Sequence, residues 1–147
     1  MTVKLILLAI FGVAMAHLEG VVVVYLRKAC GILGTESNKA VLENFPKDYV
    51  FIERTREAAT IVMLVVISFL VGETWLEKTL VFLWTFAFWD LFYYVSLYLL
   101  IKWPPTLSTI DVLFLIPCPW IAPVWVPIGI SLLTIITIAV LYLCAVV

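Results

Sequence analysis

Three ionisable residues lie inside stretches of sequence that are apolar and long enough to cross a lipid bilayer. Asp90 lies in the middle of the aromatic run 80–101, and His17 and Glu19 lie near the middle of the run 5–26. Ionisable groups at that depth are costly, and they usually face a bundle interior, where they pair, bind ions or relay protons. A histidine with carboxylates is also a set of metal ligands. We therefore expect His17, Glu19 and Asp90 to converge in one intramembrane polar centre.

Two tyrosines accompany Asp90 on the same predicted helix. Tyr93 and Tyr94 follow it by three and four residues, which places a hydroxyl near the carboxylate's side of a helix. A buried carboxylate needs hydrogen-bond donors. Tyr93, Tyr94 or a residue of the first apolar run is therefore the predicted donor to Asp90.

A second polar group marks the predicted mouth of this centre. Glu53, Glu57 and Thr60 recur at helical spacing, and Ser68 and Gly72 continue roughly along the same face. A polar face on a membrane helix normally points to other helices, so Glu53, Glu57 and Thr60 are candidate relay residues. The alternative is that Glu57 is an interfacial carboxylate paired with Arg54 or Arg56, because charges near helix ends can reach the interface.

The elements that must position these residues follow from composition. The chain has 147 residues, of which 65% are hydrophobic and 13% charged, and its mean hydropathy is +1.20. Soluble domains hold roughly 45–50% apolar and about 25% charged residues. Four apolar runs, about 5–26, 57–72, 80–102 and 121–146, approach the ~20 residues that span a hydrocarbon core. The prediction is one all-α domain, a four-transmembrane-helix bundle.

The basic residues predict an orientation for this bundle. Of the nine Lys and Arg residues, only Lys4 and Lys78 lie away from the loop 27–56 and the connection after residue 102. Positive loops stay inside, so both termini of this multi-pass membrane protein are expected outside and the loop 27–56 in the cytoplasm. The net charge of −1 argues against a nucleic-acid partner.

Small residues in the first run predict close helix packing. Gly12, Ala16 and Gly20 repeat every four residues, a spacing that lets another helix approach closely. The run resembles a signal peptide with a cleavage site before His17, but it continues through 21–24, so we expect an uncleaved helix. The three cysteines have neither disulfide-framework nor zinc-site spacing.

A proline-rich stretch precedes the last run. Ser108 to Asp111 reads as a capping box that opens a short helix ending near Ile116. Pro117, Pro119, Pro123 and Pro127 then follow with two tryptophans. We expect a short interfacial or re-entrant helix. It is either a stiff elbow leading into the last span or a wall over the site, since non-helical backbone at membrane depth must be covered by protein or line a cavity.

Several blocks together resemble a known group of proteins. They are the segments 53–60, 88–94, 102–105 and 111–120, with a Trp-Asp and paired-tyrosine helix and a proline-tryptophan elbow. In this the chain resembles a group of small, uncharacterised prokaryotic multi-pass membrane proteins. The resemblance covers about the last two thirds of the chain, and it implies that these blocks belong together without implying an activity.

Three classes of function fit these residues. The first is a non-catalytic membrane subunit or scaffold, in a homo-oligomer or larger complex, whose polar centre binds a partner chain, a lipid or a quinone-like molecule. The second is a proton- or ion-conducting oligomer that uses His17, Glu19 and Asp90. The third is a metal or redox enzyme with ligands among His17, Glu19, Glu57 and Asp90, although one histidine without a Glu-x-x-His pair departs from the usual di-iron pattern. Whether any reaction is catalysed, and which cofactor is bound, stays open, and hydrolysis has the least support.

Overall fold

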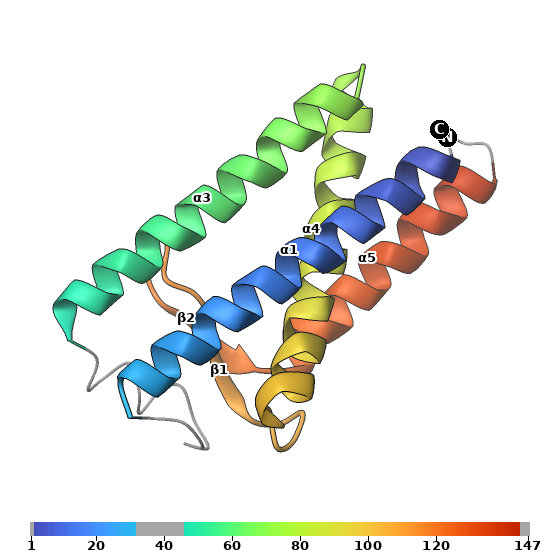
Figure 1. Ribbon diagram of the computed structural model, residues 1–147. Coiled ribbons are helices and arrows are strands. Elements are labelled where there is room, and N and C mark those ends of the chain that lie inside the picture. Colours follow the sequence, from blue (N-terminus) through green and yellow to red (C-terminus); the bar gives the residue numbers. More distant parts are fainter. Residues whose placement is uncertain (1, 32–45, 145–147) are drawn as a thin grey trace.

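The computed structural model describes residues 2–31 and 46–144 of the chain (Figure 1). This part of the chain is mostly helical, with one small antiparallel sheet. In chain order the elements are α1 (Thr2–Ala29), α3 (Lys47–Val71), α4 (Trp75–Ile101), β1 (Ile110–Phe114), β2 (Trp120–Pro123) and α5 (Trp125–Leu143). The helix α4 packs against all three other helices and is the centre of the bundle.

Three of these helices are long and apolar enough to cross a membrane. They are Val3–Ala29, Trp75–Ile101 and Trp125–Leu143, and they correspond to the first, third and fourth predicted spans. The helix α3 is longer than the predicted run 57–72, because it begins at Lys47 and carries its charged residues in its first half. Its apolar half alone is shorter than the ~20 residues of a full span.

Close packing between α1 and α4 follows from the small residues of α1, as predicted. A methyl group added at Gly12 would lie 2.9 Å from the backbone oxygen of Thr85, and one added at Gly20 would lie 3.1 Å from Cβ of Ser96. Ala16, between the two glycines, is completely buried. Gly12, Ala16 and Gly20 therefore face α4, and their small size sets how closely the two backbones approach.

The two ends of the bundle differ in character. At the end where α1 begins and α5 finishes, buried apolar side chains form a cluster: Leu8, Leu80, Val81, Trp84 and Ile138. At the other end, the β1–β2 hairpin lies beside the last turns of α1 and the first half of α3 (Figure 1). The candidate polar residues lie on the hairpin side of the apolar cluster.

The hairpin corrects the predicted all-α fold. Residues 110–123 form two antiparallel strands, with Ile110 opposite Pro123 and Val112 opposite Ile121, where a short helix was expected. The predicted capping box does not form, because Asp111 accepts a hydrogen bond from Tyr94 at 2.9 Å instead of reaching back to Ser108. The last helix consequently starts at Trp125 and not at residue 121.

Candidate functional site: a polar cavity at the hairpin end

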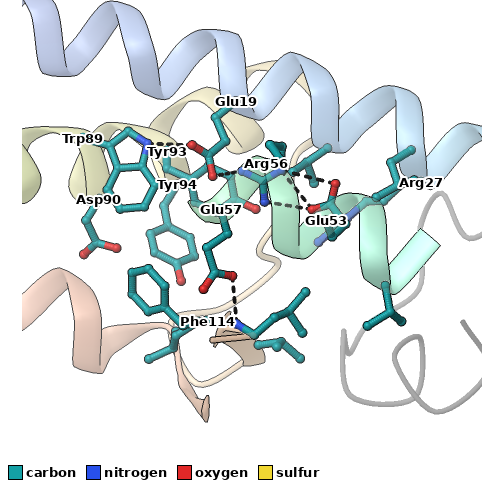
Figure 2. A pocket seen from close by; sticks show the side chains of 16 residues that line it. Glu19, Arg27, Glu53, Arg56, Glu57, Trp89, Asp90, Tyr93, Tyr94 and Phe114 are labelled. Carbon is teal, nitrogen blue, oxygen red and sulfur yellow. Dashed lines mark hydrogen bonds and ion pairs between the residues drawn. The ribbon is translucent and has the colours of Figure 1, made fainter. Parts of the chain in front are cut away.

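A cavity of about 120 Å³ lies between α1, α3, α4 and β1 (Figure 2). Its lining combines acidic, basic, aromatic and aliphatic side chains. Its charged and aromatic residues are Glu19, Arg27, Glu53, Arg56, Glu57, Trp89, Asp90, Tyr93, Tyr94 and Phe114. The structure thus brings the predicted Glu19, Asp90, Tyr93 and Tyr94 to one cavity with the predicted mouth residues Glu53 and Glu57.

An ion-pair network joins α1 to α3 on one wall of the cavity. The guanidinium of Arg56 forms ion pairs with Glu19 and with Glu53, and its Nη2 lies 2.8 Å from Oε2 of Glu53. Glu19 also accepts hydrogen bonds from Trp89 Nε1 at 2.9 Å and from the Thr60 hydroxyl at 3.2 Å. All of its acceptor oxygens are thus occupied by the protein, and Glu19 holds three helices together.

Arg56 stays charged within this network. An arginine side chain keeps its positive charge in proteins, and the carboxylates of Glu19 and Glu53 balance that charge here. Its side chain is 23% exposed, against 9% for Glu19. The network is therefore a structural cross-link that is reached from outside at Arg56.

The side chain of Glu57 binds backbone N–H groups of the hairpin. Its carboxylate accepts the N–H of Leu115 at 2.8 Å (Figure 2). It also accepts the N–H of Ile116 at 3.0 Å. The next residues, Pro117 and Pro119, have no N–H to satisfy. A backbone N–H without a partner is costly away from water, and here most N–H groups of the turn are either absent or bound by Glu57. The interfacial pairing of Glu57 with Arg54 or Arg56 is not what the structure shows.

Asp90 lies on the α5 side of the cavity and is half-buried. Its Oδ2 accepts a hydrogen bond from the Ser131 hydroxyl of α5 at 2.7 Å, whereas the sequence pointed to Tyr93, Tyr94 or helix α1 as the donor. Among the described residues, no donor reaches the other oxygen, Oδ1, and no basic side chain forms an ion pair with Asp90. Ser131 therefore holds Asp90 in place, but one of its carboxylate oxygens can still accept hydrogen bonds.

The two predicted tyrosines have different surroundings. Tyr94 is buried and donates to Asp111 on β1, which ties α4 to the hairpin. The Tyr93 ring meets the Tyr94 ring edge-on at 5.3 Å, and its hydroxyl makes no hydrogen bond to another residue in the described ranges. Arg27 lies over the ring of Trp103, 4.2 Å from the ring centre, and lines the cavity near the end of α1.

His17 does not join this site. It is exposed on α1 and does not line the cavity, because it stands about 200° around the helix from Glu19. Of the four candidate metal ligands, the cavity receives only carboxylates: Glu19, Glu57 and Asp90. Within residues 2–31 and 46–144, no three His, Cys, Asp or Glu side chains are grouped so that they could hold a metal ion.

Sequence reasoning missed three residues that build the site. Arg56 was considered only as a partner for Glu57, Asp111 only as part of a capping box, and Ser131 was not proposed as a site residue. A signal existed for Arg56, since a basic residue three positions after Glu53 shares its helix face. The contacts of Asp111 and Ser131 join elements far apart in sequence, and spacing gives no signal for them.

Comparison of the chain with protein-family models, with curated protein sequences and with solved structures gives no match. We therefore infer the function of the chain from the geometry of the cavity.

Proposed function

We propose that this chain is a four-span integral membrane protein that binds a small amphiphilic molecule, such as a lipid or a quinone-like compound, in the cavity at the hairpin end. The observation that carries the proposal is the mixed lining of that cavity. Aliphatic and aromatic side chains form part of the wall, while Asp90 and Tyr93 offer hydrogen-bonding atoms that the described protein leaves open. Ligand sites are typically mostly apolar with a few placed polar groups.

The surface of α3 supports its role as the remaining span. Its polar residues Glu53, Glu57, Thr60 and Ser68 are buried. Its exposed side carries large apolar side chains: Phe51, Ile52, Val62, Met63, Val66, Phe69 and Leu70. A helix that is polar inside and apolar outside suits a lipid environment, since intramembrane charges face the bundle interior. The basic residues of 27–56 then favour a cytoplasmic position for the hairpin end.

The saturation of the carboxylates favours binding over conduction. In Glu19, Glu53 and Glu57, both carboxylate oxygens accept hydrogen bonds from protein donors. Beyond Asp90, the interior of the bundle is occupied by the apolar cluster that contains Leu80 and Ile138. In the part of the chain that the structure describes, the cavity is thus a chamber at one end and not a polar path across the bundle. A non-catalytic binding subunit fits this arrangement best.

Filling the cavity tests the proposal. Leu113 lines it from β1, so Leu113→Trp should displace a bound amphiphile, whereas Leu132→Trp on the exposed side of α5 should not. Each protein is purified in a mild detergent, and its co-purified lipids and quinones are identified by native mass spectrometry. The proposal expects a defined molecule bound to the wild type and to Leu132→Trp, and absent from Leu113→Trp. Equal retention by all three proteins would contradict it.

A further inference from the structure

The carboxylates of the cavity are satisfied unequally. Glu19 and Glu53 share the guanidinium of Arg56, and Glu57 receives two backbone N–H groups. Asp90 receives a single hydroxyl, on one of its two oxygens. A buried carboxylate without a cation or several donors is costly. Asp90 is therefore the lining group at which a further partner would stabilise the protein most.

The overall charge of the lining has the sign that attracts a cation. Four carboxylates and two guanidiniums line the cavity, which gives a formal charge of −2. Both guanidiniums are already engaged, Arg56 with two carboxylates and Arg27 over Trp103. An anionic head group would meet more negative than positive charge here, and it would have to displace a protein carboxylate to reach Arg56.

Aromatic side chains complete the environment of Asp90. Trp89, Tyr93, Tyr94 and Phe114 all line the same cavity, and Phe114 lies against Trp89 with ring centres 6.2 Å apart. The faces of aromatic rings attract cations, and rings combined with a carboxylate are a known means of recognising alkylammonium groups. A cavity of about 120 Å³ has room for such a compact head group, not for a large folded ligand.

We infer that the amphiphile bound in this cavity carries a compact organic cation, an alkylammonium head, that pairs with Oδ1 of Asp90 against the surrounding aromatic rings. The inference rests on the proposed function and adds the charge of the ligand to it. The ammonium head supplies the counter-charge that the described protein does not give Asp90. The apolar part of the ligand contacts other aliphatic side chains of the lining, such as Leu26 and Val50.

A charge-matched pair of probes tests this inference. Benzyltrimethylammonium and neopentylbenzene have the same shape and differ in one positive charge. Their binding to the protein in lipid nanodiscs of phosphatidylglycerol is measured by calorimetry, with a short-chain quinone as a third probe. The cation should bind at least roughly tenfold more tightly than its neutral counterpart, which corresponds to one charge-dependent contact.

A variant pair locates the charge. Asp90→Asn keeps an oxygen for Ser131 but removes the negative charge, and it should lower the affinity for the cation by roughly tenfold or more without changing that for neopentylbenzene. Glu73→Gln removes the same charge at an exposed position near the far end of α3 and should change neither. The wild-type comparison of the two probes remains informative even if Asp90→Asn does not fold.

The outcomes separate the two proposals. Equal binding of both probes, or a quinone that binds while the cation does not, would overturn the cationic ligand and leave the amphiphile site in place. Failure of all three probes to bind would overturn the amphiphile site itself. Nanodiscs doped with phosphatidylcholine distinguish two sources of the head group. Weaker cation binding there assigns a lipid head group as the ligand, and unchanged binding assigns a free amphiphilic cation.

Discussion

The carboxylate of Glu57 on α3 accepts the backbone N–H of Leu115 at 2.8 Å, and it thereby fixes the end of β1 to the wall of the cavity. The neighbouring N–H of Ile116 is bound by the other oxygen of the same carboxylate at 3.0 Å. Since Pro117 follows directly, Glu57 takes the place of the strand partner that the hairpin loses at its turn. A single side chain thus satisfies two backbone donors where the non-helical backbone lies beside α3.

Removing this acceptor should loosen the hairpin. Glu57→Gln keeps one acceptor oxygen and presents an NH₂ group to the second N–H, so one buried donor is left without a partner. The expected loss of stability is about 1–3 kcal/mol. Thermal unfolding in detergent measures it, and amide exchange at Leu115 and Ile116 should speed up. Glu73→Gln, on an exposed carboxylate, is the control, and equal melting temperatures for both variants would show that Glu57 does not hold the hairpin.

The contact between α1 and α4 should be intolerant of added volume. A Cβ at Gly12 would lie 2.9 Å from a backbone oxygen of α4, so Gly12→Ala must push the helices apart and should cost about 1–3 kcal/mol. Gly129→Ala adds the same methyl group where no atom lies within 4 Å, and it should be neutral or stabilising. Chemical unfolding of the two variants in parallel checks this. A Gly12→Ala protein as stable as the wild type would mean that the helices are not in close contact.

The shape of the Arg56 side chain should matter as well as its charge. Its fork reaches Glu19 and Glu53 at once, which the single ammonium of lysine cannot reproduce. Arg56→Lys should therefore cost about 1–2 kcal/mol, kept modest by its 23% exposure. Arg54→Lys, at the exposed position two residues earlier, should have no effect. Melting curves that fall together for both variants would argue against the ion-pair cross-link.

The proposed orientation can be read from single cysteines. A protein that keeps only the native Cys144 and one that carries only Asp48→Cys present exposed thiols beyond opposite ends of the bundle. A membrane-impermeant maleimide should label Cys144 in intact cells and should label position 48 only after the membrane is opened. The reverse pattern would place the hairpin end outside.

The sequence revealed those features that depend on the periodicity of a single helix. The buried polar face of α3 and the small residues of α1 both follow from spacing alone. The sheet could not be foreseen, because its strands are short and the competing capping pattern at residues 108–111 is a good one. What decides between them is the hydrogen bond from Tyr94 to Asp111, a contact across 17 residues.

The carboxylates of the site could be predicted from the sequence, but their hydrogen-bond donors could not. Glu19 and Asp90 were identified from the cost of a carboxylate at membrane depth, yet their donors, Arg56 and Ser131, lie 37 and 41 residues away in sequence. His17 satisfied the same criterion as Glu19 and is exposed. Depth in the membrane can be estimated from a sequence, but the side of the helix that faces the bundle depends on how the helices pack.

In the proposed complex, the polar head of the bound amphiphile lies beside Asp90 and Tyr93. Nuclear Overhauser effects between the head-group protons of the bound molecule and protein methyl groups test it most directly, in nanodiscs with methyl-labelled protein. We expect contacts from these protons to methyl groups of Val23 and Leu113, which line the cavity, and none to Leu8 in the apolar cluster at the other end. Their loss in Leu113→Trp would complete the assignment. Head-group contacts confined to methyl groups outside the cavity, such as those of Leu132, would contradict it.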